Sequence, residues 1–561
     1  MSHLDDALRA TYRQSFLHAL QDGSAKPFLI PYSMLGSYII PMLWLTIPHV
    51  SRPWLYQTRW LVLAFAVVFN LHVMSVMSST NFGSSYTVGT WAAFGIMQTL
   101  DLLVWKRPQF DAARVIEVVA QKSNSKAEAE AEAEAEAEAE AEAEAETETE
   151  IRQSGATTNG HGASTDQSLK LRKSVANVTL NKLAQSETTT DDETEYRWQK
   201  FPAEAPFLTR LGWVSDLMLS LRGAGWNFSI TSIPRPVIPP VIHDNAKVDV
   251  SSMPRQTSSG YTRFLTEREF LRSHVINLVL CAIIIDFIYL QMSVDPYYLA
   301  GPNHEYELPP LIAHKSPLRL LFCRQSYAIV FVVSCITYVF STTAIFQYYI
   351  FKIFFPSRAF LWKFPSTFGK FSEVLDRGLA GWWGSWWHQT FRVVFLAPSV
   401  YLIKKGYLKR GSLAANVFGL FISFFQSGLL HAAGSYTTIP DTKPMKHVYF
   451  FVLQAVGIVL QQHLAFALRY VAPELPRAIR RAGNLAFAVS WMFVTAPMFL
   501  DDLAVGGLWL HQVMPISPFR LMGLGHVLSF GHADNTWWRW DKDCWFKMYE
   551  AKHWWEVGIA F

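Results

Sequence analysis

Apolar residues along this chain are gathered into long runs that are separated by shorter polar stretches. Each run is close to the roughly 20 residues that an α-helix needs to cross the ~30 Å hydrocarbon core of a bilayer. The alternating pattern of barrel strands is missing, so helices are the expected spanning elements. The pattern therefore predicts an all-α, polytopic integral membrane protein. About eight transmembrane helices are expected, at residues 27–48, 60–78, 83–105, 273–292, 326–351, 411–433, 446–470 and 483–510.

A shorter apolar segment, 387–403, has basic residues on both sides. Lys370 precedes it and Lys404 follows it. Basic loops favour the cytoplasmic side of a membrane. With eight full crossings and these loops in the cytoplasm, segment 387–403 is expected to be a re-entrant helix. By the same count, Arg9 and Arg13 fall on the opposite side.

The long stretch between the third and fourth runs differs from the rest of the chain. It contains an alternating Ala-Glu tract, whose like charges repel along a helix, and a Ser/Thr/Asn/Gly-rich segment. Residues 120–192 are therefore expected to form a disordered cytoplasmic insertion without a catalytic role. The expected organisation is N-terminal helices (1–105), insertion (106–205), ordered loop (206–271), a core of further membrane helices (272–535) and aromatic-rich tail (536–561).

Composition narrows the possible classes of protein. Hydrophobic residues make up 50% of the chain and charged residues 17%, which excludes an ordinary soluble globule. The formal net charge is only +4 because the Ala-Glu tract holds 12 glutamates; outside it, 49 basic residues face 33 acidic ones. This positive excess is spread between the apolar runs, so no nucleic-acid partner is expected. The four cysteines form no CxxC pair and predict no disulfide framework or zinc site.

One histidine stands inside an apolar run that has no other ionisable residue. His431 ends the sequence Ser427-Gly-Leu-Leu-His, and Ser427 lies four residues earlier on the same helix face. An ionisable group at membrane depth indicates a functional site. A neutral imidazole can take a proton from an alcohol, as a general base does. The alternative is a histidine that only bonds a neighbouring helix.

A second group of polar and aromatic residues lies at the start of segment 387–403. The sequence Trp382-Trp-Gly-Ser-Trp-Trp-His-Gln389 brings Trp383, Trp387, His388 and Gln389 together, with Arg392 close behind. Tryptophans favour the membrane interface, so a structural aromatic belt is one interpretation. A buried histidine beside polar groups, however, is costly unless it is paired or lines a cavity.

Other candidate chemistry is weaker. Asp286 is expected to pair with a polar group of another helix. Asp501 and Asp502 lie where a helix is expected to break; helix capping is the preferred interpretation, and a role in shaping the site is the alternative. The remaining histidines are too scattered for a di-iron site, and no metal site is expected. No G-x-S-x-G, Walker A or dinucleotide motif is present.

Several of these motifs together resemble a known family. Phe364-Pro-Ser-Thr-Phe-Gly369, the W-x-x-W-H-Q element, Ser427-Gly-Leu-Leu-His431 and Arg222-Gly-Ala-Gly-Trp226 are similar to the wax-synthase-like branch of the membrane-bound O-acyltransferases, especially its fungal members. The resemblance implies the helical fold of that family and identifies residues 272–535 as a wax-synthase-like acyltransferase core. It places Arg222 and Trp226 with Trp383, Trp387, Gln389, Arg392 and Ser427 in the substrate or acyl-CoA site.

The resemblance also implies an activity. Such an enzyme moves an acetyl group from acetyl-CoA to a hydroxyl of a lipophilic small molecule, in fungal terpenoid, meroterpenoid, polyketide or alkaloid biosynthesis. It implies that His431 is the base and that His388 is the second site residue. Acyl-CoA is then a co-substrate, no cofactor is bound, and an endoplasmic-reticulum membrane is expected. A long-chain wax ester synthase and a membrane transporter remain alternatives, and the oligomeric state stays open.

Overall fold

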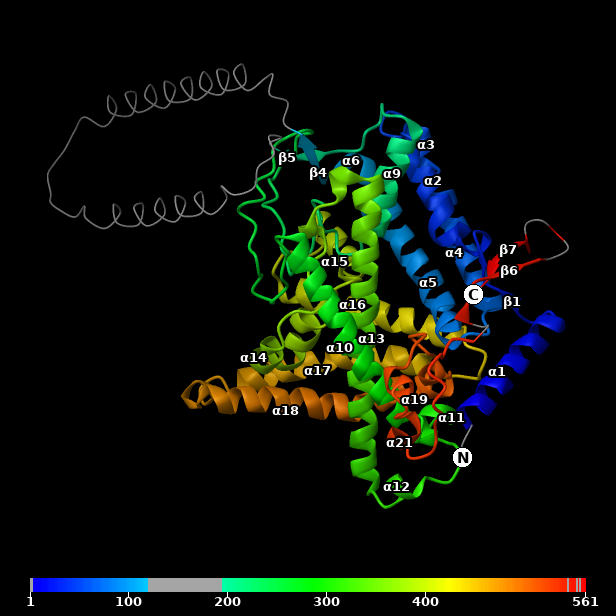
Figure 1. Ribbon diagram of the computed structural model, residues 1–561. Coiled ribbons are helices and arrows are strands. Elements are labelled where there is room, and N and C mark those ends of the chain that lie inside the picture. Colours follow the sequence, from blue (N-terminus) through cyan, green and yellow to red (C-terminus); the bar gives the residue numbers. More distant parts are fainter. Residues whose placement is uncertain (1–3, 120–193, 542–543, 551–552, 554–555, 561) are drawn as a thin grey trace, which may run out of the picture. The chain divides into compact units, whose positions relative to one another are not determined.

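The computed structural model describes residues 4–119, 194–541, 544–550, 553 and 556–560, and these residues are mostly helical (Figure 1). Met1–Ile116 and Trp198–Phe561 form one unit, and Glu117–Arg197 form another. The predicted disordered insertion, 120–192, lies outside the described residues. Every candidate site residue lies in the first unit.

Six helical stretches in the described part of the chain are long and apolar enough to cross a membrane. A seventh is possible because α18 (Arg477–Thr495) and α19 (Pro497–Val505) form one stretch bent by 41°. The six are α3 with α4 (Pro53–Gln57, Arg59–Val76), α5 with the π-helix η3 (Phe82–Leu100, Asp101–Trp105), α10 (Glu267–Met292), α13 (Pro317–Phe354), α16 (Leu413–Tyr436) and α17 (Met445–Ala467).

The structure differs from the sequence-based prediction at 27–48, where a spanning helix was expected and none of sufficient length is found. The helical part of this segment begins only at Tyr32 and consists of three short pieces, η1 (Tyr32–Met34), η2 (Leu35–Ile39) and α2 (Ile40–Thr46). Pro27 and Pro31 keep the preceding residues out of the helix because proline lacks the backbone N–H that a helix needs. The remaining helix is too short for a crossing, so the described residues hold six or seven candidate spanning helices where about eight were predicted.

The segment predicted to be re-entrant contains helix α15 (Arg392–Lys404), which has 13 residues and a proline, Pro398, inside it. At ~1.5 Å per residue this helix is shorter than the bilayer core. It packs against α16 and α5.

The other described elements include no further stretch that is long and apolar enough to cross a membrane. The helices are α1 (Leu4–Gln21), α6 (Pro108–Asp111), α9 (Phe207–Leu219), α11 (Pro296–Ala300), α12 (Pro310–Ala313), α14 (Ser372–Gly381), α20 (Pro518–Leu521) and α21 (Gly525–Leu528). The 3₁₀ or π turns are η4 (Pro356–Arg358), η5 (Leu361–Lys363), η6 (Trp382–Trp386), η7 (Ala472–Glu474) and η8 (Leu508–Leu510). The strands are β1 (Lys26–Pro27), β2 (Leu29–Ile30), β3 (Met77–Ser78), β4 (Arg114–Val119), β5 (Thr194–Gln199), β6 (Lys547–Tyr549) and β7 (Gly558–Ala560). They pair as β1–β3, β4–β5 and β2–β7–β6.

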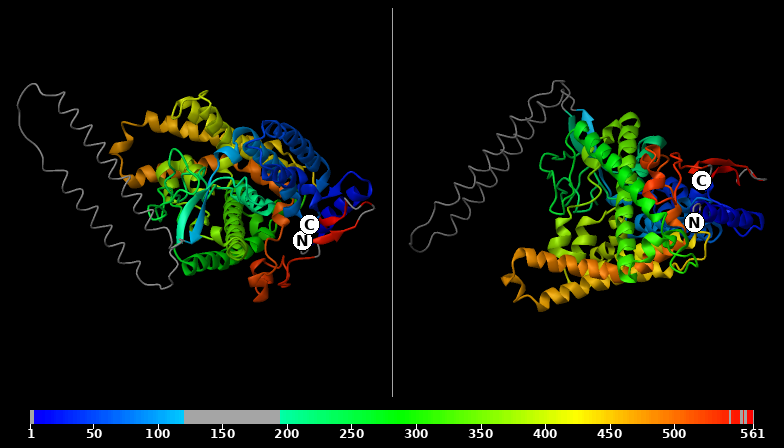
Figure 2. Two further views of the ribbon diagram at one scale, coloured as in Figure 1. Left: turned by 90° about the horizontal axis from the view of Figure 1, so that it is seen from above. Right: turned by 60° about the horizontal axis from the view of Figure 1, so that its bottom comes forward.

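Helix α16 lies between two partners, α5 and α17, with which it shares extensive contacts. Glycines allow α16 to lie close to both of these helices. A Cβ atom at Gly89 of α5 would meet the carbonyl oxygen of Ala433 at 1.9 Å, and one at Gly428 of α16 would meet the Cα atom of Val448 at 2.7 Å. Side chains at either position would force the helix axes apart. Elsewhere α10 packs along α13, and α4 packs along α5 (Figure 1 and Figure 2).

A buried cluster of charges ties α9 to the turns η4 and η5. The carboxylate of Asp216 lies 3.1 Å from Arg114 Nη1, 2.7 Å from Arg358 Nη2 and 2.5 Å from Lys363 Nζ. Burial alone would raise the pKa of this carboxyl, but Arg358, Lys363 and Arg114 together hold it well below its usual range. Asp216 therefore remains ionised and joins three segments that are far apart in the sequence.

Candidate active site

His431 lies near the C-terminal end of α16, between Gly428, where α16 closely approaches α17, and Ala433, where it closely approaches α5. Gly89 and Gly428 allow these approaches, because both positions lack the Cβ atom that would fill the helix interface. His431 itself is half-buried. The fold thus places the His431 imidazole at a closely packed junction of three helices, α5, α16 and α17.

Three side chains hold the imidazole of His431. Its Nδ1 atom lies 2.9 Å from the hydroxyl oxygen of Tyr86 on α5. Its ring stacks on Phe451 of α17, with centroids 5.0 Å apart and an interplanar angle of 9°, and meets the ring of Phe499 edge-on at 5.3 Å. In the tautomer with the proton on Nδ1, His431 donates to Tyr86 and Nε2 keeps its lone pair. That lone pair is what a base needs.

A second histidine lies beside the first. The His447 ring on α17 is 6.4 Å from the His431 ring and nearly parallel to it. His447 Nε2 is 2.8 Å from the Oδ2 atom of Asp502, which also accepts a 2.5 Å hydrogen bond from the Ser435 hydroxyl. The other Asp502 oxygen accepts from the backbone N–H of Lys443 at 2.6 Å. Asp502 therefore joins α16, α17 and the turn between them.

The sequence-based interpretation missed this pair. It described the histidines other than His388 and His431 as scattered, and it assigned Asp502 to helix capping. Asp502 does receive one backbone N–H, but its other two partners are side chains on neighbouring helices. His447 and Asp502 are 55 positions apart in the chain. A buried acid and a buried histidine in adjacent apolar runs were the available clue, since each needs a partner.

His388 follows η6, in the bend before α15. Its Nδ1 atom is 3.2 Å from the Thr390 hydroxyl, and its ring contacts Trp387 and Phe391 at centroid distances of 5.4 and 6.3 Å. Phe391 belongs to the same packed cluster as Leu430, which precedes His431 in α16. The two predicted histidines are thus connected through one layer of apolar side chains.

Gln389 and Arg392 fix the shape of this bend. Gln389 donates from Nε2 to the carbonyl oxygens of Trp383 and Trp387, at 3.0 and 2.6 Å. Arg392 donates from Nη1 to Gln389 Oε1 and to the Gly384 carbonyl, at 2.7 and 2.9 Å. Both amide hydrogens of Gln389 are therefore engaged by the protein.

Trp383 reaches toward His431 from the same bend. Its ring contacts Phe424, Phe450 and Phe451, and Phe451 is the ring on which His431 stacks. Within the described part of the chain, the buried indole N–H of Trp383 has no hydrogen-bond partner. An unpaired buried N–H is costly, which makes it a candidate donor to a bound molecule.

The remaining predicted site residues mainly make contacts that hold the fold together. Arg222 donates to the carbonyl oxygens of Ser366 and Pro365 at 2.9 and 3.0 Å, so it holds the Phe364–Gly369 segment. Trp226 packs edge-on against Trp213 in a different cluster of the core. Ser427 lies one helical turn before His431 on α16. Among the described residues, no group of three His, Cys, Asp or Glu side chains could hold a metal ion.

The site as a whole combines an imidazole with a wall of aromatic side chains. Phe499 contacts both His431 and His447, and Phe451 covers the flat face of His431. Such surroundings disfavour charge and exclude water. The arrangement can accept a proton from a hydroxyl group while limiting competing hydrolysis.

Comparison with known proteins gives a consistent assignment. Residues 364–453, which include His388, His431 and His447, match the model of the membrane-bound O-acyl transferase family. Acetyltransferase ple2 of Rhodocybe pseudopiperita is 25% identical over 56% of this chain and 72% of its own length. Acetyltransferase eriL of Hericium erinaceus is 26% identical over 28% of this chain and 40% of its own length. Acetyltransferase spyB of Aspergillus fumigatus is 30% identical over 25% of this chain, and only 26% of its own length is covered. No solved structure matches the chain.

Proposed function

The chain belongs to the membrane-bound O-acyltransferase family, and we propose that this enzyme transfers an acetyl group from acetyl-CoA to a hydroxyl of a lipophilic small molecule. The observation that carries the proposal is His431, held by Tyr86 and stacked on Phe451 inside the matched region. The acetyltransferase names of the fungal relatives support acetyl as the acyl group. Their sources support a role in fungal secondary metabolism, with terpenoids, meroterpenoids, polyketides or alkaloids as acceptors.

His431 acts as the general base in this proposal. Its Nε2 atom takes the hydroxyl proton while the alcohol oxygen attacks the thioester carbonyl carbon. The tetrahedral intermediate then loses the CoA sulfur, and the imidazolium returns the proton to that thiolate. Tyr86 keeps Nδ1 bonded throughout, which keeps the ring in one orientation. No covalent enzyme intermediate is needed.

The oxyanion of the intermediate needs a hydrogen-bond donor. Gln389 is a poor donor because two carbonyl groups of the protein already occupy its amide. His388 and the indole N–H of Trp383 are the better candidates. We assign them as the two donors, with Trp383 favoured by its contact with Phe451.

The acyl donor is expected to approach from the side of the C-terminal end of α5, where η3 continues the helix and Lys106 follows it. Basic residues there and in the loop after α15 attract the phosphates of CoA. An endoplasmic-reticulum location would place that end in the cytoplasm, where acetyl-CoA is available.

A direct assay tests the proposal. Membranes from cells that express the chain are incubated with the metabolite that accumulates in a deletion strain, and with acetyl-CoA or palmitoyl-CoA in parallel. The proposed function predicts a product that is heavier by one acetyl group, formed only with acetyl-CoA. Product with palmitoyl-CoA alone would indicate the long-chain wax ester synthase instead. Accumulation of unmodified metabolite on one side of the membrane, without any ester, would favour a transporter.

A further inference from the structure

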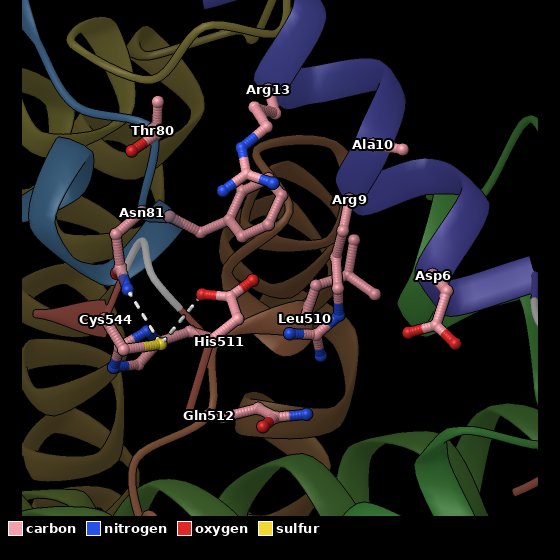
Figure 3. Close-up of a pocket in the computed structure, with 12 residues that line it drawn as sticks. Asp6, Arg9, Ala10, Arg13, Thr80, Asn81, Leu510, His511, Gln512 and Cys544 are labelled. Carbon is pink, nitrogen blue, oxygen red and sulfur yellow. Dashed lines mark hydrogen bonds between the residues drawn. The ribbon is translucent and has the colours of Figure 1, made fainter. Parts of the chain in front are cut away.

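A polar cavity of about 160 Å³ lies beside the N-terminal end of α5 (Figure 3). Four segments meet there: helix α1, the start of α5, the residues after η8 and part of the C-terminal tail. The lining residues that matter here are Arg9, Asn81, Phe82, His511, Gln512 and Cys544. The site described above does not use them.

Polar atoms in this cavity lack partners in the described part of the chain. Arg9 donates from Nη2 to the Tyr289 hydroxyl, but its buried Nε has no hydrogen-bond acceptor. The buried Nδ1 of His511 has no partner either. Burial, aided by the charge of Arg9, lowers the pKa of His511 to about 4, so this imidazole is neutral near pH 7. Buried polar groups without partners are rare in a folded protein and indicate a missing ligand or water.

The walls of the cavity continue into the walls of the His431 site. Phe82, which lines the cavity, precedes Tyr86 by four residues on α5, or about 6 Å of helix rise. On the other side, η8 packs against both α5 and α19, and α19 carries Asp502. His511 is pressed against α5: a Cβ atom at Gly83 would lie 2.7 Å from its ring. A molecule in the cavity would therefore lie about one helical turn from the residue that binds His431.

The lining limits the chemistry of the ligand. Two arginines, Arg9 and Arg13, face two carboxylates, Asp6 and Asp541, so the ligand needs no net charge. Guanidinium, imidazole and amide groups donate to oxygen. An apolar acyl chain does not suit this cavity, because it would leave these polar groups without hydrogen-bond partners and would gain no free energy over staying in lipid.

We propose that this cavity binds the neutral, oxygen-rich part of the acceptor alcohol, with Arg9 and His511 donating hydrogen bonds to its carbonyl or hydroxyl oxygens. The inference rests on the proposed function and narrows it, because it selects a polyoxygenated small molecule over a simple fatty alcohol. The cavity lies at the opposite end of α5 from Lys106. Acceptor and acyl-CoA would thus approach His431 from opposite ends of this helix.

The proposal is tested by steady-state kinetics of the Arg9→Gln variant. Two acceptors are compared: the metabolite that accumulates in the deletion strain, and 1-hexadecanol. A hydrogen bond to a charged group contributes about 1.5–3 kcal/mol, which corresponds to a change of about tenfold or more. Arg9→Gln should raise the KM for the metabolite by at least about tenfold, with the KM for acetyl-CoA and kcat within about twofold. Any rate with 1-hexadecanol should not change. Arg319→Gln, an exposed arginine at the start of α13, is the matched control and should behave as the wild type.

A second measurement uses the thiol of Cys544, which lines the cavity. Methyl methanethiosulfonate should raise the KM for the metabolite in the wild type but not in Cys544→Ser, and dithiothreitol should reverse the effect. An unchanged metabolite KM in both Arg9→Gln and the thiol-modified enzyme would overturn the proposal. So would an equal change in the KM for acetyl-CoA. If acetyl transfer still depends on His431 in that case, the proposed function stands and only the cavity assignment fails.

Discussion

The hydrogen bond between Tyr86 and His431 decides which nitrogen of the imidazole is available for chemistry. The hydroxyl of Tyr86 is 2.9 Å from Nδ1. Phe451 and Phe499 fix the plane of the ring but offer no polar contact. The tautomer of His431 therefore depends on Tyr86.

Tyr86→Phe should lower the acetyl-transfer rate without unfolding the protein. The ring of the new side chain keeps the packing, but Nδ1 loses its partner and both tautomers become populated. Removing the hydrogen-bond partner of a metal-bound histidine typically lowers activity by about 10–100-fold, and we expect a similar loss of rate here. Initial rates per amount of membrane-inserted enzyme measure it. Tyr449→Phe, at an exposed position of α17, is the control; equal rates for the two variants would show that Tyr86 does not orient the base.

Asp502→Asn tests the second polar group of the site. An amide cannot accept all three hydrogen bonds that Asp502 now accepts, from Ser435, His447 and the Lys443 backbone. The change should lower both the melting temperature and kcat, the latter by about tenfold or more. Asp501→Asn is the matched control because, among the described residues, Asp501 accepts a single side-chain hydrogen bond, from the Tyr297 hydroxyl at 2.8 Å. Indistinguishable melting curves and rates for the two variants would refute a positioning role.

At this scale, the sequence allowed only part of the site to be predicted. His431 could be found because it is the one ionisable residue in its apolar run. Tyr86 could not, since tyrosine is common near membrane interfaces and only the fold shows its distant partner. For His447 the sequence offered only the clue that an acid, Asp502, lies in the next apolar run. The packing of Trp226 far into a separate cluster was equally invisible in its motif.

At the scale of elements, the position of α16 depends on close contacts with α5 and α17. The apolar runs predicted six of the spanning helices, because run length alone determines whether a helix can cross. Run length failed at 27–48, where Pro27 and Pro31 shorten the helical part. Which helices would lie beside α16 could not be predicted from the sequence, although Gly89 and Gly428 prove to lie at its contacts with α5 and α17.

Gly428→Ala should therefore weaken the α16–α17 contact. Its Cβ atom would come within 2.7 Å of the Val448 Cα, which is backbone and cannot move without shifting α17. Overpacking of this kind costs about 1–3 kcal/mol. Thermal unfolding in detergent should show a lower melting temperature and lower activity. Gly483→Ala on α18, where nothing lies within 4 Å, should be neutral or stabilising; a similar loss in both variants would contradict the close-contact explanation.

At the scale of the whole molecule, the Asp216 cluster joins α9, β4 and the turns before α14 through buried charges. Its low pKa has a consequence for stability against acid. The contribution of Asp216 is fully present above about pH 4, the ordinary value for an aspartate, and is lost as the pH falls toward its lower folded value. The cluster should thus persist across the physiological range.

Asp216→Asn should be severely destabilising because it leaves Arg114, Arg358 and Lys363 buried without a carboxylate. Removing one partner of a buried ion pair typically costs about 3–5 kcal/mol. Lys363→Met is the informative comparison, since Asp216 then keeps two guanidinium partners and the loss should be small. The yield of folded protein in detergent and its melting temperature measure both effects. Equal losses from the two variants would mean that the carboxylate is not the centre of the cluster.

The central claim, that His431 is the base, is tested most directly by ester formation in His431→Gln, with His431→Ala in parallel. A glutamine can hydrogen bond to Tyr86 but cannot take a proton at neutral pH. If His431 is the base, both variants insert into the membrane and bind acetyl-CoA, yet lose at least the ~10²–10⁴-fold in rate typical of an absent general base. Ester formation by His431→Gln at close to the wild-type rate would contradict this assignment, and would show that His431 only bridges α16 and α5.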